Sequence, residues 1–183
     1  MRDFNWFDCE DAIRLLVWSL QKEQKKPVLY HSLRVGSLLF YYGYDYETQI
    51  AGILHDILED SDVTEWLIAE KFGQNVASIV KANSKNNSLP KPEVLEDIVK
   101  RCHDYGKFAL VVKMADVYDN FRFYVRAENE GEIDRCKFLA NLIIQYRDPI
   151  WNDKIFELAN TVMAYKSWDS IDFDIPIIEI KNH

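Results

Sequence analysis

Apolar residues recur at intervals of three and four along most of this 183-residue chain, and this spacing constrains the fold more than any other feature. Such intervals place apolar side chains on one face of an α-helix, whereas a strand requires strict alternation. Six glycines and five prolines are few for this length, which favours helices over a turn-rich sandwich. The sequence therefore predicts an all-α bundle of about eight or more helices in one domain.

Polar stretches, glycines and prolines mark the expected ends of the helices. The predicted helices cover residues 7–24, 31–42, 46–60, 65–71, 74–82, 92–105, 107–126, 132–146 and 154–165. The Asn-rich stretch 83–91 is the clearest long loop, and it is either a plain connection or a lid over a site. The domain is expected to span residues 1–170. Residues 171–183 form an extended tail, where Pro176 reduces a strand-like pattern to an edge strand or an arm.

Net charge and cysteine usage limit the possible partners. The formal net charge of −8 argues against broad binding of nucleic acid, although a small phosphorylated substrate needs only a local basic patch. Cys9, Cys102 and Cys136 are widely spaced and odd in number, so we expect reduced thiols in a cytoplasmic protein. No apolar run reaches the length needed to cross a bilayer, and we expect no membrane partner.

Residues 50–60 carry the densest group of ionisable side chains. On a single helix, the apolar residues of this stretch fall on one arc. The opposite arc carries Gly52, His55, Asp56, Glu59 and Asp60. An acidic cluster of this kind is often only a solvated helix face, but adjacent imidazole and carboxylate donors suit a divalent metal. Gly52 is expected to leave space for a ligand among these groups.

Two further residues complete a possible metal site. His31 lies near the start of the preceding predicted helix. Asp116 follows the apolar run 108–112, where a buried carboxylate is costly unless it is paired or bound to metal. With His55 and Asp56 these residues supply two imidazoles and two carboxylates. Such a mixed set suits Mn, Fe, Zn, Mg or Co and leaves positions open for water.

The order His31, His55-Asp56 and Asp116 resembles the signature of the HD-domain metal-dependent phosphohydrolases, which are all-helical. The finer match is to the hydrolase domain of RelA/SpoT proteins and to stand-alone small alarmone hydrolases, over about residues 10–165. It rests on Tyr30-His31, on Ala51-Gly52-Ile53-Leu54-His55-Asp56-Ile57-Leu58-Glu59-Asp60-Ser61, on Phe72-Gly73, on Val112-Lys113-Met114-Ala115-Asp116 and on Asn120-Phe121-Arg122.

The resemblance implies a role for each matching residue. Glu59 and Asp60 would position or deprotonate the attacking water, and Asn120 would contact the nucleotide. Lys25 and Lys26, just before the first metal-binding histidine, would neutralise a pyrophosphate. The implied cofactor is a divalent metal, most simply Mn. The implied reaction is removal of the 3′-pyrophosphate from guanosine tetra- or pentaphosphate.

Some positions depart from the family pattern and leave the substrate open. Ser32 replaces the usual proline, Ser61 replaces a threonine, and Arg34 stands where an apolar or small residue is usual. Arg34 adds either a phosphate contact or a salt bridge. The alternatives are a nucleotidase or phosphatase acting on a 5′-nucleotide or NADPH, and a non-catalytic nucleotide-binding domain. The tail also makes a homo-oligomer conceivable.

Overall fold

The computed structural model describes residues 6–20, 27–86 and 88–167, and within these ranges all regular structure is helical. This confirms the all-α prediction. The elements are α1 (Trp6–Ser19), α2 (Val28–Tyr41), α3 (Tyr46–Leu54), α4 (Ile57–Asp60), α5 (Glu65–Phe72), α6 (Gln74–Asn83), α7 (Lys91–Tyr105), α8 (Lys107–Arg126), α9 (Glu130–Tyr146), the 3-10 helix η1 (Lys154–Glu157) and α10 (Leu158–Ala164).

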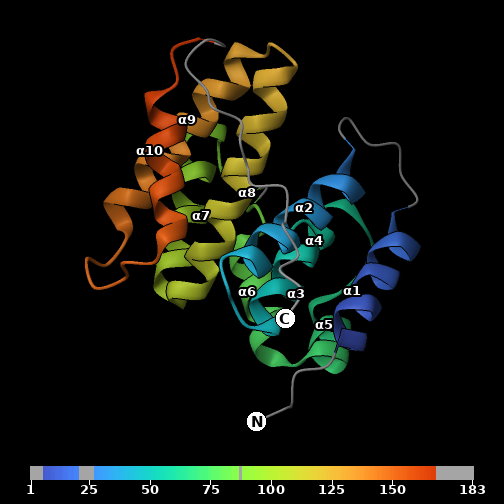
Figure 1. The fold of residues 1–183 in the computed structure, drawn as a ribbon. Coiled ribbons are helices and arrows are strands. Elements are labelled where there is room, and N and C mark those ends of the chain that lie inside the picture. The colour runs from blue at the N-terminus through green and yellow to red at the C-terminus, as the bar shows by residue number, and fades with distance from the viewer. Residues whose placement is uncertain (1–5, 21–26, 87, 168–183) are drawn as a thin grey trace, which may run out of the picture.

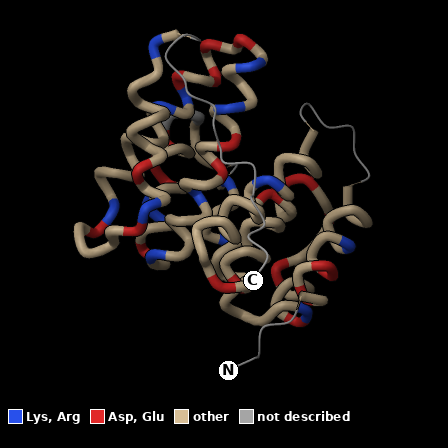
Figure 2. The backbone as a smooth tube through the Cα atoms, viewed as in Figure 1, with Lys and Arg blue, Asp and Glu red and all other residues tan. Residues whose placement is uncertain are grey.

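Helices α3, α6 and α8 occupy the middle of the bundle, with α1 and α5 on one side and α7, α9 and α10 on the other (Figure 1). Helix α8 is almost fully buried from Ala109 to Val117. Lys/Arg and Asp/Glu positions are interspersed over the bundle (Figure 2). No helix in the described part of the chain is long and apolar enough to cross a membrane. Because α8 is buried at the centre of the bundle and contacts α2 and α3, its buried polar residues can face these two helices.

Local signals located several helix ends correctly. The side chain of Thr64 caps α5 by accepting a hydrogen bond from the backbone N–H of Leu67. Gly43 follows α2 with φ at +78°, a conformation that glycine adopts without strain. The loop predicted at residues 83–91 is slightly shorter, because Asn83 ends α6 and Lys91 begins α7. Lys25, Lys26 and the tail 171–183 lie outside the described residues.

The prediction of one continuous helix over residues 46–60 is wrong. Helix α3 ends at Leu54, and the short α4 begins at Ile57, so His55 and Asp56 form the junction. The Nδ1 atom of His55 donates a hydrogen bond to the carbonyl oxygen of Gly52 at 2.8 Å. In an unbroken helix that carbonyl accepts from the residue four positions on. The side chain thus competes for a backbone acceptor, a recognised cause of helix interruption.

The expectation that Gly52 leaves room for a ligand is also wrong. Gly52 faces α2, where a β-carbon would collide with the side chain of Leu39 and approach Val35 Cγ1 to 3.4 Å. Gly36 on α2 is similarly tight, with Ile53 Cγ1 at 2.5 Å from the position of an added β-carbon. The two glycines let α2 and α3 pack closely, which brings His31 on α2 beside His55. Gly52 therefore positions the site without lining it.

Gly52→Ala is expected to destabilise the protein by about 1–3 kcal/mol, because the added methyl group overpacks the contact between α2 and α3. The measurement is urea unfolding, with the free energy of unfolding extrapolated to water. Gly131→Ala is the control, since nothing but a side-chain oxygen at 3.8 Å lies near an added β-carbon there. A Gly52→Ala variant as stable as the wild type would contradict this account of the packing.

Candidate metal centre

The four predicted metal ligands come together, with one ligand atom from each lying within 4.8 Å of all the others. His31 Nε2 is 3.2 Å from His55 Nε2 and 3.2 Å from Asp116 Oδ1. His55 Nε2 is 3.2 Å from Asp56 Oδ2 and 3.4 Å from Asp116 Oδ1. The four residues come from α2, the junction between α3 and α4, and α8, and they lie inside the bundle.

These spacings and donor types fit a divalent metal ion. Ligand atoms about 2.1 Å from a common ion lie about 3.0 Å apart in octahedral and about 3.4 Å apart in tetrahedral geometry. In addition, each imidazole engages its Nδ1 atom elsewhere: His55 with the Gly52 carbonyl and His31 with Asp119 Oδ2. Both Nε2 atoms therefore face the common point, as metal-binding histidines with fixed tautomers do.

Charge is concentrated at this point despite its burial. Burial by itself would lower the pKa of His55, but the carboxylates of Asp56 and Asp116 outweigh burial and raise that pKa to about 10. Burial would likewise raise the pKa of Asp116, yet Lys113 and His55 hold it well below its usual range. A buried carboxylate that stays ionised, as Asp116 does, attracts cations strongly, and this suits a divalent ion.

Asp116 is the residue that most of the surrounding donors contact. Its Oδ2 atom pairs with the Nζ of Lys113 at 3.1 Å, and its Oδ1 atom accepts a hydrogen bond from Asn120 Nδ2 at 2.5 Å. Lys113 is only 4% exposed, and its Nζ is also 3.4 Å from the carbonyl oxygen of Asn83. These contacts orient Asp116 so that Oδ1 points toward both imidazoles. Asn120, predicted to contact a nucleotide, also holds this candidate ligand.

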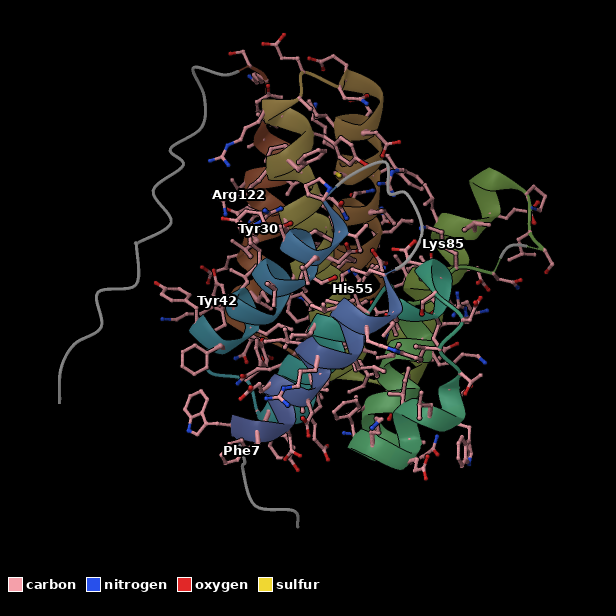
Figure 3. The ribbon with its side chains drawn as sticks, turned by 90° about the vertical axis from the view of Figure 1, so that its right-hand side faces the viewer. Phe7, Tyr30, Tyr42, His55, Lys85 and Arg122 are labelled. Carbon is pink, nitrogen blue, oxygen red and sulfur yellow. The ribbon has the colours of Figure 1, made fainter. Side chains whose placement is uncertain are left out.

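A narrow cavity opens beside the four residues. Its lining residues are Asp56, Glu59, Lys85, Val94, Leu95, Ile98, Lys113, Asp116, Asn120, Arg135 and Leu139. Glu59 lies at this cavity and is held by Lys85, whose backbone N–H contacts Oε1 and whose Nζ contacts Oε2, both at 2.7 Å. Figure 3 shows Lys85 to one side of His55. The cavity therefore combines the candidate ligands with a carboxylate, several cations and an apolar wall.

The other predicted site residues have different surroundings. Asp60 is half-buried on α4 and is not among the described residues that line the cavity. Arg34 binds Asp119 through two guanidinium nitrogens, which is the salt bridge that the sequence left open. Lys25 and Lys26 lie outside the described residues. The roles of all four in binding or catalysis stay predictions.

Sequence reasoning missed three polar residues that the fold brings to the site: Asp119, Lys113 and Lys85. Asp119 is 3% exposed and lies one helical turn after Asp116 on α8. The signal was an apolar residue two positions away on either side, because a carboxylate buried among apolar residues needs a partner. Lys113, also on α8, carried the same signal. The sequence contained no such indication for Lys85, because a lysine in an Asn-rich loop is usually a solvated side chain.

The described part of the chain is thus an all-helical domain with a candidate metal site, formed by two imidazoles and two carboxylates that converge on one point. The model of the family described as "HD domain" matches residues 9–135. The chain therefore belongs to the HD-domain family.

The chain is also similar to curated relatives and to a solved structure. The chain is 32% identical over 141 residues to a guanosine-3′,5′-bis(diphosphate) 3′-pyrophosphohydrolase of Aquifex aeolicus, covering 72% of this chain and 20% of that protein. It is 35% identical over 107 residues to the protein of that name (MESH1) in Danio rerio, covering 57% of this chain and 59% of that one. The chain thus matches less than two thirds of the length of these curated relatives. A solved metazoan orthologue of SpoT, described as hydrolysing ppGpp, superposes with a TM-score of 0.72 at 18% identity, covering 88% of this chain and 96% of that one, which shows the shared fold.

Proposed function

We propose that the chain is a metal-dependent phosphohydrolase that removes the 3′-pyrophosphate from guanosine tetra- or pentaphosphate. The observation that carries the proposal is the convergence of His31, His55, Asp56 and Asp116 beside a cavity that contains Glu59. Relatives 32–35% identical bear the name of this activity, which supports the choice of substrate. The proposed ion is Mn²⁺, and Zn, Fe, Mg or Co would fit the same donors.

The residues around the cavity divide the chemistry between them. A divalent ion held by the four ligands would polarise the phosphate and lower the pKa of a bound water. In this proposal Glu59 would accept a proton from the attacking water, and the adjacent Asp60 would assist it. Lys85, Lys113 and Arg135 supply positive charge for a pyrophosphate, and Asn120 offers an amide to the nucleotide.

Substrate entry requires a rearrangement at Lys85. The cavity has a volume of only about 40 Å³, whereas pockets that hold small-molecule ligands have volumes of about 300–1,000 Å³. The cavity as it stands thus accommodates terminal phosphate groups at most. An incoming phosphate would compete with Glu59 for the Nζ of Lys85. That exchange would widen the entrance and free one oxygen of Glu59 to accept a proton.

The test is turnover by the purified protein with Mn²⁺ and a panel of nucleotides. We expect guanosine 3′,5′-bis(diphosphate) to yield pyrophosphate, with activity abolished by EDTA and restored by Mn²⁺. Release of orthophosphate from NADPH or from a 5′-nucleotide, without pyrophosphate from the guanosine substrate, would favour the phosphatase alternative. Binding without any turnover would favour a non-catalytic nucleotide-binding domain. A cytoplasmic location and a homo-oligomeric state stay predictions.

A further inference from the structure

His31 and His55 differ in what holds the nitrogen that faces away from the metal point. His55 Nδ1 donates to the backbone carbonyl of Gly52, which is neutral. His31 Nδ1 lies 2.6 Å from Oδ2 of Asp119, a carboxylate that is only 3% exposed. A carboxylate partner is a stronger acceptor than a carbonyl, so it fixes the imidazole tautomer and ring plane more firmly. The candidate ligand on α2 thus has the stronger support.

Asp119 is itself held by Arg34. The guanidinium contacts both carboxylate oxygens, with Nε 2.6 Å from Oδ1 and Nη2 2.8 Å from Oδ2. This two-point contact fixes the plane of the carboxylate, which a single contact from a lysine would not do. Arg34 also offsets a buried negative charge that would otherwise be costly. The contacts therefore run in one line from Arg34 through Asp119 to His31 Nδ1.

Arg34 lies on a different side of the metal point from the cavity. Its guanidinium lies over the ring of Tyr30, with Cζ 4.6 Å from the ring centroid. Figure 3 shows Tyr30 and Lys85 on opposite sides of His55. Arg34 is not among the described residues that line the cavity with Lys85. Its guanidinium is thus placed to support a ligand from behind and not to contact a phosphate in that cavity.

We propose that Arg34 and Asp119 are a positioning pair that locks His31 in its metal-binding tautomer and thereby sets the metal affinity of the site. The pair rests on the proposed metal site but is independent of which nucleotide is the substrate. It joins α2 and α8, the two helices that supply His31 and Asp116. Neither member is expected to touch the metal or the substrate.

The experiment measures the Mn²⁺ dissociation constant by isothermal titration calorimetry, in the absence of nucleotide. Asp119→Asn is expected to weaken Mn²⁺ binding about 10- to 100-fold, since the amide can present its NH₂ group to His31 and favour the wrong tautomer. Arg34→Gln should weaken binding less, and Arg34→Lys should recover part of that loss. The double variant should lose less than the product of the two single effects, because both residues act through one contact.

Asp97→Asn is the matched control. Asp97 pairs with Arg101 at 2.8 Å, and the Arg101 side chain is 31% exposed, close to the 30% of Arg34. This ion pair lies within α7, which supplies none of the candidate ligands, so Mn²⁺ affinity should be unchanged. Urea unfolding of each metal-free variant separates a loss of affinity from a loss of folding. If Asp119→Asn does not fold, the two Arg34 variants carry the same test.

A second readout follows the tautomer directly. In ¹⁵N-labelled, Zn²⁺-loaded wild-type protein, the Nδ1–H proton of His31 should give a downfield, slowly exchanging signal that Asp119→Asn removes. Folded Asp119→Asn protein that binds Mn²⁺ as tightly as the wild type would overturn the positioning pair alone. Wild-type protein that binds no divalent ion would overturn both the pair and the metal site.

Discussion

Replacing Glu59 by glutamine is expected to lower kcat for pyrophosphate release by about 10²- to 10⁴-fold while leaving Mn²⁺ affinity unchanged. Glutamine has the same size and can still accept a hydrogen bond from the backbone N–H of Lys85. It has no basic oxygen to take a proton from water. Because Glu59 is not one of the four converging ligands, the metal should still bind. The measurements are pyrophosphate release at saturating substrate and calorimetric titration with Mn²⁺.

Glu65→Gln is the control for this prediction. Glu65 also holds a lysine, with Oε2 2.8 Å from the Nζ of Lys81, but it lies on α5 and does not line the cavity formed by the described residues. Its replacement should leave kcat and Mn²⁺ affinity at wild-type values. Wild-type turnover by the Glu59→Gln variant would remove Glu59 from the mechanism. A loss of metal affinity in that variant would instead make Glu59 a fifth ligand.

Asp116→Ala should abolish tight metal binding and also destabilise the metal-free protein by about 3–5 kcal/mol. The second effect arises because Lys113 is buried and has Asp116 as its carboxylate partner at 3.1 Å. Burial would lower the pKa of Lys113, but Asp116 and the weaker contributions of nearby acidic groups together outweigh burial and raise that pKa. Without Asp116 a buried cation loses its partner. Urea unfolding with and without Mn²⁺ measures both effects together.

The size of the metal effect can be stated in advance. A ligand present at 100 times its dissociation constant stabilises the folded state by about 2.7 kcal/mol, so the wild type should gain this amount from Mn²⁺ and Asp116→Ala should gain nothing. Asp97→Asn again serves as control, because the part-exposed pair with Arg101 is worth about 1 kcal/mol or less. An Asp116→Ala variant that Mn²⁺ stabilises as strongly as the wild type would exclude Asp116 as a ligand.

Helical periodicity was sufficient to predict the fold class and most helix ends. It works because a helix brings side chains three and four residues apart onto one face, and residues so close in the sequence can be recognised without knowledge of the tertiary structure. It failed at residues 46–60, where the helix breaks at His55. There the His55 side chain competes for the backbone carbonyl of Gly52. The spacing of apolar residues along a continuous helix does not reveal such a competition. The apolar residues assigned to one arc of this segment are nevertheless buried or partly buried, and the residue assigned to the wrong arc is Gly52, which faces α2.

The candidate ligands could be named from residue type and order, because few residues bind divalent metals and the pattern resembles a known family. That His31, His55, Asp56 and Asp116 meet within 4.8 Å depends on how α2, α3 and α8 pack. The roles of Asp119 and Arg34 depend on the same packing, since they lie 85 residues apart in the sequence and 2.6 Å apart in space.

The sequence by itself thus determined the helices, the donor chemistry and the family. Only the tertiary structure decided which atoms face one another: the Nε2 atoms toward a common point, Asp119 behind His31, and Lys85 over Glu59. The physical reason is that local periodicity records which face of a helix is buried but not which residue of a neighbouring helix lies opposite. At this site, the close packing of α2 against α3 at Gly36 and Gly52 brings His31 opposite His55.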